Sequence, residues 1–462
     1  MLLPTLAAPD EREAVRFGSA VLTHADLAGA AKAVAARLGT ARRVAVWAEP
    51  TPQTCVAVVG ALLAGAAVVP INPKVGEREL AHILGDSAPE VTIGGPSADF
   101  VVDLAERLDG PLPAEADPES PAFIVYTSGT TGPPKGVLLP RRAIATNLDA
   151  LADAWEWTAA DVVVHALPLF HVHGLILGVL GPLRRGGAVW HLGRFDTAAL
   201  ADALTSGATM MFGVPTMYHR LAADCEADPA LAAAVGRARL LVSGSAALPA
   251  TDHARITRAT GQAVVERYGM TETLMNCGVR ASADRRPGTV GPPIDGVEVR
   301  LVDEAGALVA DGEIGEIEVR GPNLFLGYLN RPEATAEAFR DGWFRTGDMA
   351  VRESEGYIRI VGRRATDLIK SGGYKIGAGE IENALLDHPG VAEVAVTGEP
   401  DDDLGERIVA WVVPAGERPT AEELADHVAA LLSPHKRPRV VRFLESLPRN
   451  EMGKVTKRAL HA

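Results

Sequence analysis

The sequence YTSGTTGPPKG at residues 126–136 decides how this chain is interpreted. It holds three glycines, two prolines, five hydroxyl side chains and Lys135. No hydrophobic period runs through it, so we expect neither an ordinary helix nor an ordinary strand here. Glycines let backbone N–H groups approach an anion closely, hydroxyls add donors, and the lysine adds a point charge. The stretch predicts a polyphosphate-binding loop. It differs from a Walker A loop because Gly136, rather than Ser or Thr, follows the lysine.

Short apolar segments alternate with alanine-rich helical segments on both sides of this loop. Buried strands are expected at residues 44–46, 67–71, 123–126, 162–167, 188–192, 210–212, 240–242 and 263–265, and helices at 27–38, 143–154 and 252–259. This alternation is typical of βα units and a largely parallel sheet. The apolar run at residues 56–69 is shorter than the roughly 20 residues that a membrane-spanning helix needs. We interpret it as a buried helix leading into a strand, with Gly65 as the break.

The pattern changes after Gly288. Short strands at residues 297–302, 315–320 and 357–361 indicate a β-rich subdomain. A small α/β unit follows, with helices at 381–386 and 421–432 and strands at 391–396, 408–413 and 440–443. We therefore expect an α/β fold with a large N-terminal domain over residues 1–362 and a small C-terminal domain over 363–462. The large domain would combine βα subdomains with the β-rich one.

Composition limits the functional classes. The chain has 462 residues, of which 47% are hydrophobic and 23% charged, and its formal net charge is -14. This globular, acidic composition argues against nucleic-acid binding, which needs lysine and arginine to displace counterions. Cys55, Cys225 and Cys277 show no metal or disulfide spacing, and the N-terminus lacks the basic segment of a secretory signal. We expect a cytoplasmic protein with no membrane partner. The oligomeric state is left open.

Four further motifs follow the loop in order. They are ERYGMTET at 266–273, FRTGDMA at 344–350, GRRATDLIKSGGYKIGAGEIE at 362–382 and PRNEMGKV at 448–455. Each alone is weak, because a Thr-Gly-Asp is often a simple turn and a C-terminal lysine is usually solvated. Their order and separation are specific. Together with the loop they resemble the adenylate-forming superfamily of acyl-CoA synthetases, luciferases and peptide-synthetase adenylation domains, over nearly the whole chain.

This resemblance implies an AMP-forming ligase that uses ATP, Mg²⁺ and coenzyme A. Such enzymes join a carboxylate to AMP, release pyrophosphate, and pass the acyl group to a thiol while the small domain rotates. Lys454 would bridge the carboxylate and the α-phosphate, Glu272 and Thr127 would hold magnesium, and Asp348 and Arg363 would bind the ribose. The loop residues would bind the phosphates, and the glycine-rich turn would pass the pantetheine arm. The implied nucleotide set also contains Ser128, Gly129, Thr130, Thr131, Gly132, Lys135, Tyr268, Gly269 and Thr271, and the implied CoA set is Lys370, Ser371, Gly372 and Gly373.

One departure from the superfamily pattern affects the ribose assignment. Many members have two residues between the Gly-Arg pair and the aspartate, whereas here three residues separate Arg363 from Asp367. Either Arg363 keeps the ribose role despite an insertion, or Arg364 takes it. We prefer Arg363 because Gly362 precedes it. The insertion also leaves open whether Ala365 or Thr366 is the pivot of the domain rotation.

The acyl side carries an unusual charge. Arg267 precedes the Tyr-Gly pair, and an arginine facing an acyl pocket suggests a second carboxylate on the substrate. The alternative is that Arg267 pairs with Glu266 or a surface acid. The resemblance is strongest to malonyl-CoA synthetases, so we expect malonate, with methylmalonate tolerated. His173, which is also placed in the catalytic set, and then His171 would contact the second carboxylate, although either could be a core histidine. Ser243, Gly244 and Met270 complete the expected acyl-binding set.

Other functions remain open. A stand-alone adenylation enzyme could load a carrier-protein thiol, but no carrier segment follows Lys457, so a free-standing CoA ligase is favoured. A ligase for another short acid is a further alternative. A purely nucleotide-binding module is disfavoured by the set of Lys135, Glu272, Asp348 and Lys454.

Overall fold

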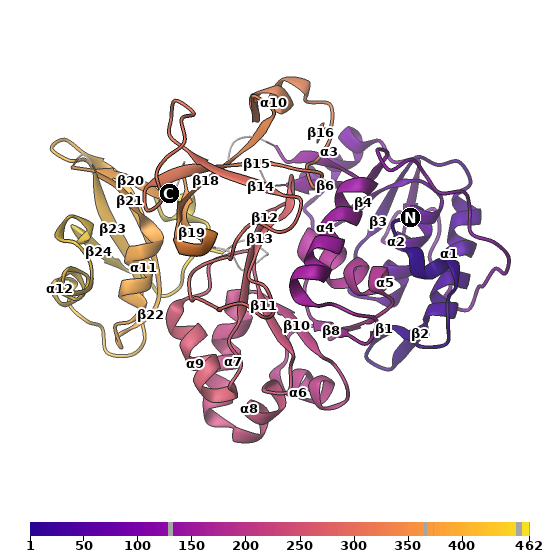
Figure 1. Cartoon of the computed structure of the whole chain (residues 1–462), viewed down its shortest axis with the longest axis horizontal. Coiled ribbons are helices and arrows are strands. Elements are labelled where there is room, and N and C mark those ends of the chain that lie inside the picture. Colours follow the sequence, from indigo (N-terminus) through magenta and orange to yellow (C-terminus); the bar gives the residue numbers. More distant parts are fainter. Residues whose placement is uncertain (128–132, 365–366, 373, 450–454, 462) are drawn as a thin grey trace.

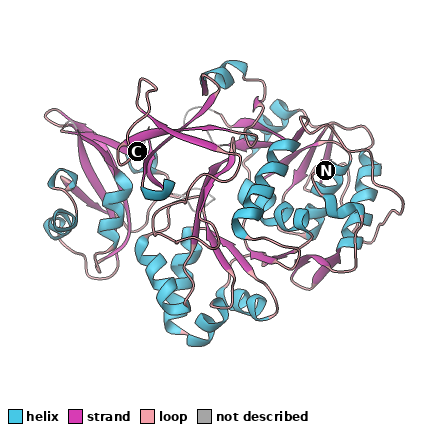
Figure 2. Ribbon diagram, in the orientation of Figure 1, coloured by secondary structure: helices cyan, strands magenta, loops and turns pink. Residues whose placement is uncertain are grey.

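The computed structural model describes residues 1–127, 133–364, 367–372, 374–449 and 455–461. Two large sheets form the N-terminal part of the chain, and two five-stranded sheets follow (Figure 1). Helices flank the sheets, as Figure 2 shows. The expected α/β class, with a large N-terminal part and a smaller C-terminal part, is confirmed. Within the described ranges, no helix is both long and apolar enough to cross a membrane.

The six-stranded sheet carries the phosphate-loop motif. Its order is β16-β7-β6-β4-β3-β5. Strands β5, β3, β4 and β6 run parallel to their neighbours, and β6, β7 and β16 pair antiparallel. The apolar run forms helix α2, and Gly65, with φ of +79°, precedes β4, as expected. The bounds are β3 Arg43–Trp47, β4 Ala67–Ile71, β5 Val91–Ile93, β6 Pro121–Thr127, β7 Lys135–Pro140, β16 Gly327–Tyr328, α1 His24–Leu38, α2 Pro52–Leu63, α3 Glu77–Ser87 and α4 Arg141–Trp155.

The opening stretch differs from its prediction at both ends. β6 extends to Thr127, β7 begins at Lys135, and these two residues pair across the hairpin. The strand expected to end at residue 126 thus extends one residue further, and the expectation of no ordinary strand in the stretch is wrong at Thr127 and at residues 135–136. The apolar residues that follow Gly136 belong to one antiparallel ladder, and this ladder continues into the polar stem of the loop.

The eight-stranded sheet has the order β13-β12-β11-β10-β8-β9-β1-β2 and is parallel from β12 to β1. The antiparallel strands β2 and β13 close its two edges. A buried π-helix, η2 at Val172–Leu180, follows β8. The other bounds are β1 Glu13–Phe17, β2 Ala20–Thr23, β8 Val162–His165, β9 Ala188–His191, β10 Met210–Gly213, β11 Leu240–Ser243, β12 Val265–Met270, β13 Leu274–Gly278, α5 Gly181–Arg185, α6 Thr197–Thr205, α7 Pro215–Ala227, α8 Pro229–Val235 and α9 Ala250–Thr260.

The β-rich part and the C-terminal lobe complete the chain. The first has a sheet of β14 Glu298–Val302, β15 Ile314–Arg320, β17 Phe339–Arg340, β18 Trp343–Arg352 and β19 Ile358–Arg363, with α10 at Pro332–Glu337. The C-terminal lobe contains β20 Leu368–Ser371, β21 Tyr374–Gly377, β22 Val391–Asp401, β23 Gly405–Pro414 and β24 Val440–Phe443, with α11 Ala378–Leu386 and α12 Ala421–Leu431. Figure 1 places this lobe beside β18 and β19 and away from α1. The boundary at residue 362 stays a prediction.

Short 3₁₀ turns connect several of these elements. They lie at Pro4–Ala7, Ser354–Gly356, Pro434–Lys436 and Lys457–His461. All three cysteines, Cys55, Cys225 and Cys277, are buried and unpaired. Burial raises the pKa of the Cys55 and Cys277 thiols to about 12.

Candidate active site

Asp348 lies in a cluster of three hydrogen-bonding side chains. The Tyr268 hydroxyl donates to Asp348 Oδ2 at 2.5 Å, and Arg363 Nε lies 2.8 Å from Asp348 Oδ1. Strand pairing aligns Asp348 on β18 with Arg363 on β19. Arg364 instead pairs with the buried Glu316 at 3.0 Å. The structure thus brings Arg363, and not Arg364, to the carboxylate expected at the ribose.

Glu272 occupies the turn between β12 and β13, as the sequence predicts. Its Oε1 accepts a hydrogen bond of 2.9 Å from the Tyr328 hydroxyl. Burial raises the pKa of the Glu272 carboxyl, and the Tyr328 bond opposes that rise. A buried carboxylate with one neutral hydrogen-bond donor is a suitable ligand for a hard cation. The attraction to the cation would offset the free-energy cost of burying the charge. Glu272 therefore fits the expected magnesium ligand.

The stem of the phosphate-loop motif is anchored to α3. Tyr126 donates its hydroxyl to Asp86 at 2.9 Å, and a ring nitrogen of His82 lies 2.8 Å from the Pro134 carbonyl oxygen. At the end of the loop, Lys135 Nζ lies 4.9 Å from the centroid of the Tyr328 ring. These contacts fix both strands that carry the loop. The expected phosphate ligands Ser128, Gly129, Thr130, Thr131 and Gly132 lie outside the described residues.

Gly269 and Thr271 lie close in sequence to Glu272. A Cβ on Gly269 would lie 1.9 Å from the Leu274 carbonyl oxygen, at the irregularity in the β12–β13 ladder. Only glycine fits such an approach of two backbones. Thr271 and Met270 lead into the turn that holds Glu272.

A cavity of about 280 Å³ lies at the carboxyl ends of three neighbouring parallel strands. Its wall follows β8 at Leu167, β10 at Val214 and β11 at Ser245, and it includes His171 and His173. Ligands in open α/β sheets bind at this end of the strands. Burial lowers the pKa of His171 to about 4 and holds the pKa of His173 well below its ordinary value. Both rings are therefore neutral at pH 7.

Arg267 is buried beside this cavity, with 5% of its surface exposed. Its Nε and Nη2 find no hydrogen-bond partner in the part of the chain that the structure describes, and the same is true of Ser243 Oγ and His173 Nε2. Burial lowers the pKa of Arg267 to about 10, so its guanidinium remains charged at pH 7. The expected pairing alternative fails for Glu266, whose carboxylate accepts from the Gly288 and Leu248 backbone N–H groups instead.

Gly244 leaves the space that Arg267 occupies. A Cβ on Gly244 would lie 2.2 Å from Arg267 Cζ. The guanidinium thus packs directly on the backbone that follows Ser243. The structure brings Arg267, Ser243 and His173 together around Gly244. The side chains of these three residues carry donors without a partner among the described residues, and such donors can bind an anion.

Three of the four expected CoA residues, Lys370, Ser371 and Gly372, lie at the end of β20. Lys370 and Ser371 end β20, and Gly372 has φ of +58°. Ser371 pairs with both Tyr374 and Gly405, and Lys370 Nζ lies 3.8 Å from Glu304 Oε1. Gly373 and Lys454 lie outside the described residues. The CoA assignment for these positions stays a prediction.

Two residues near the site were missed by the sequence reasoning. Tyr328 contacts both Lys135 and Glu272. Lys457 Nζ binds Asp367 at 2.8 Å and Glu382 at 2.7 Å, which ties the C-terminal segment to the residues after the proposed pivot. The Gly-Tyr pair before a proline-initiated helix was the only local signal for Tyr328.

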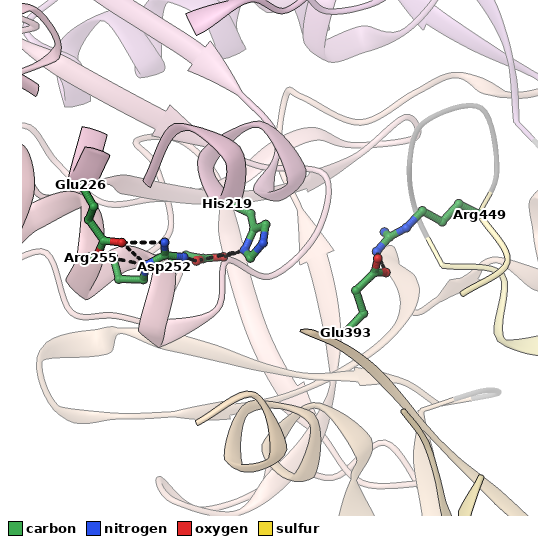
Figure 3. Close-up of polar contacts among 6 residues, drawn as sticks. All are labelled: His219, Glu226, Asp252, Arg255, Glu393 and Arg449. Carbon is green, nitrogen blue, oxygen red and sulfur yellow. Dashed lines mark hydrogen bonds and ion pairs between the residues drawn. The ribbon is translucent and has the colours of Figure 1, made fainter. Parts of the chain in front are cut away.

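A polar cluster on α7 and α9 faces the C-terminal lobe (Figure 3). His219 Nδ1 lies 3.0 Å from Asp252 Oδ2, and Arg255 links Asp252 to Glu226. Across from them, Arg449 pairs with Glu393 on β22. The hydrogen bond with Asp252 and then the charge of Asp252 raise the pKa of His219, and Glu393 adds to this rise.

The geometry defines a class before any comparison. A glycine-rich loop stem with a lysine, a buried carboxylate for a cation, an Asp–Arg pair and an anion pocket suit a nucleotide-dependent enzyme that acts on an acid. Residues 5–329 match the AMP-binding enzyme family, and residues 380–454 match the AMP-binding enzyme C-terminal domain. The chain belongs to the AMP-binding enzyme family, and the resemblance drawn from the motifs is confirmed.

Individual proteins resemble the chain over most of its length. A malonyl-CoA ligase with methylmalonyl-CoA and AMP bound is 63% identical, with a TM-score of 0.75 over 97% of this chain and 100% of that one. ATP-bound MatB from Rhodopseudomonas palustris is 35% identical, with a TM-score of 0.92 over 99% of this chain and 97% of that one. The malonate–CoA ligase of Arabidopsis thaliana is 36% identical over 90% of this chain and 77% of its own length.

Proposed function

We propose that the protein is an ATP-dependent malonate–CoA ligase that also accepts methylmalonate. It forms malonyl-adenylate and pyrophosphate, and then transfers the malonyl group to the thiol of CoA with release of AMP. The names of the similar malonate and malonyl-CoA ligases support this substrate. The observation that carries the proposal is the buried guanidinium of Arg267, which has two nitrogens without a hydrogen-bond partner among the described residues.

Malonate fits this pocket because it carries a second charge. Its distal carboxylate would accept from Arg267, with Ser243 and His173 as further donors. The reacting carboxylate would then point from the strand ends toward the nucleotide. His173 is neutral, so it can donate a hydrogen bond to an oxygen anion without adding a second cation beside Arg267. A methyl branch would meet the apolar wall that includes Leu167 and Val214.

On the nucleotide side, the residues hold ATP for attack on its α-phosphate. Asp348, oriented by Tyr268 and Arg363, would accept from the ribose hydroxyls. Lys135 would neutralise charge on the outer phosphates, and Glu272 with Thr127 would hold Mg²⁺ there. When bound, the metal supplies charge neutralisation on the phosphate oxygens. Lys454 is assigned to the reacting oxygens on the resemblance alone.

We further propose that the C-terminal domain, residues 363–462, moves between the two half-reactions. The structure fits the ATP-bound MatB better, at a TM-score of 0.92, than the 63% identical product complex, at 0.75. The more similar sequence thus has the lower TM-score. This supports a different placement of the two domains in the product complex rather than a different fold. The hinge would lie between Gly362 and Asp367. In the arrangement for thioester formation, residues 370–373 would line the path of the pantetheine arm.

The test is a comparison of acids and thiols with purified protein. We expect CoA-dependent AMP formation with malonate, slower turnover with methylmalonate, and little with propionate or butyrate. Sulfoacetate, another small dianion that could bind Arg267, serves as the competing substrate. Pyrophosphate exchange with malonate but no thioester with CoA would instead favour loading of a carrier-protein thiol. Faster turnover of sulfoacetate or of a monocarboxylate would contradict the malonate proposal.

We propose a cytoplasmic location for this activity. The support is the acidic composition together with three unpaired cysteines, which suit a reducing compartment.

A further inference from the structure

Lys135 and Glu272 sit on different sheets. Lys135 begins β7 of the six-stranded sheet, and Glu272 lies between β12 and β13 of the eight-stranded sheet. The two residues would have to act on one magnesium-bound ATP. Their separation therefore has to be held by something other than a shared strand.

The segment of residues 323–329 bridges the two sheets. The Phe325 N–H donates to the Glu272 carbonyl oxygen at 2.9 Å, and the Leu329 N–H donates to the Gly136 carbonyl oxygen at 2.8 Å. Between these contacts, β16 pairs antiparallel with β7, with Tyr328 opposite Val137. The segment is thus hydrogen-bonded at one end to the residue that carries the carboxylate and at the other to the residue after the lysine.

The Tyr328 side chain makes the same connection. Its hydroxyl donates to Glu272 Oε1 at 2.9 Å, and its ring centroid lies 4.9 Å from Lys135 Nζ. The ring of Phe325 packs edge-on against it at 5.0 Å, which limits its rotation. We propose that Tyr328 is a positioning residue for magnesium-bound ATP, whose hydroxyl orients Glu272 and whose ring orients Lys135. The proposal rests on the proposed function only for the assignment of ATP and magnesium to these two residues.

Two physical effects act through one side chain. A carboxylate is acceptor-only, so a donor fixed on one oxygen holds the carboxylate plane and directs the remaining lone pairs. A lysine ammonium is attracted to the negative face of a tyrosine ring, which restricts a long and otherwise flexible stem. Phenylalanine keeps the second effect and loses the first, and leucine loses both. The two roles can therefore be separated.

The experiment is calorimetric binding of ATP, with Mg²⁺ and with EDTA, to Tyr328→Phe and Tyr328→Leu. We expect Tyr328→Phe to reduce the enhancement of ATP affinity by Mg²⁺ about tenfold, because one hydrogen bond to a charged group is lost. Metal-free affinity should stay within about twofold. Tyr328→Leu should also weaken metal-free binding about threefold to tenfold through Lys135. Tyr357→Phe is the matched control, since Tyr357 donates to the Asp284 carbonyl oxygen and stacks with Arg286 outside the site.

A double-mutant cycle separates positioning from a general loss of structure. On a Glu272→Ala background, Tyr328→Phe should cause no further loss of magnesium-dependent affinity. An equal loss on both backgrounds, an equal loss with and without Mg²⁺, or no loss at all would overturn the proposal. Melting temperatures identify any variant that fails to fold, and if Tyr328→Leu does so, Tyr328→Phe and the cycle still decide. No acyl substrate is present, so an error in the malonate assignment would change none of these results.

Discussion

Replacing Arg267 with leucine removes a buried cation that packs against Gly244, next to the cavity-lining residue Ser245. In the structure its Nε and Nη2 have no described partner, and 5% of the residue is exposed. In the free enzyme, the desolvation of this charge lowers the stability of the folded state, and only a bound substrate anion would compensate for it. Arg267→Leu should leave the free protein at least as stable as the wild type, as judged by melting temperature. It should abolish the stabilisation that malonate gives.

The magnitude follows from the bonds that would be lost. A bidentate contact with the distal carboxylate comprises two hydrogen bonds between charged groups, each contributing about 1.5–3 kcal/mol. At about 1.4 kcal/mol per tenfold, the loss of both corresponds to roughly two to four orders of magnitude in kcat/KM for malonate. ATP affinity should change little, because Arg267 belongs to the acyl side. Arg267→Lys keeps the charge but loses the planar guanidinium, so its kcat/KM for malonate should lie between those of the wild type and Arg267→Leu.

The assay compares kcat/KM for malonate and for butyrate in the wild type, Arg267→Leu and a matched control. Arg141→Leu is that control, because Arg141 is also buried but donates to the Leu62 and Ala66 carbonyl oxygens. Arg141→Leu should lower stability and leave the malonate-to-butyrate ratio unchanged. If the ratio is also unchanged in Arg267→Leu, the arginine has a structural role only and the dicarboxylate reasoning is refuted.

Two other changes test further parts of the site, and a third tests the polar cluster on α7 and α9. Gly244→Ala places a Cβ 2.2 Å from Arg267 Cζ and should raise the KM for malonate about tenfold with ATP affinity unchanged; an unaltered KM would show that the guanidinium can move freely. Lys454→Ala should lose roughly two or more orders of magnitude in pyrophosphate exchange but still convert pre-made malonyl-adenylate to the thioester, and equal loss of both steps would remove the assignment. His219 has a raised pKa in the folded protein, so its stabilisation is fully present below its ordinary pKa of 6.5 and is lost as pH rises above that value. His219→Gln should therefore lower the free energy of unfolding more at pH 5.5 than at pH 8.5, by less than about 1 kcal/mol because the side chain is 61% exposed. A larger loss at pH 8.5 in denaturant unfolding would contradict this sign.

The alternation of apolar and helical segments was sufficient to predict most of the parallel strands, although β1 and β5 were missed. Buried parallel strands are continuous apolar runs, and β4 coincides with its predicted range, residues 67–71. The π-helix at Val172–Leu180 was not predicted, because all nine of its residues are buried and no amphipathic period marks it. Strand β16 has two residues, which form a strand only because they pair with β7. Such an element depends on tertiary contact and has no pattern of its own.

Some residues of the candidate site could be located from the sequence, whereas others needed the fold. Residue types and spacing placed Glu272 on its turn and Asp348 after a glycine, because local chemistry limits those positions. The choice of Arg363 over Arg364 needed the register of β18 against β19, since the sequence gives both arginines a similar setting. Tyr328 is 56 residues from Glu272, and only the fold brings them together. The roles of all these residues stay predictions until variants are measured.

The burial of the three cysteines has a consequence for the reaction of the acyl-adenylate with a thiol. An acyl-adenylate reacts with any thiolate that reaches it, so a cysteine of the enzyme could compete with CoA for the malonyl group. Burial raises the pKa of Cys55 and Cys277 to about 12 and that of Cys225 to about 11. At neutral pH these side chains remain protonated and shielded, which makes them poor nucleophiles. The chain therefore offers the activated acid no thiolate of its own, and the incoming CoA meets no internal competitor.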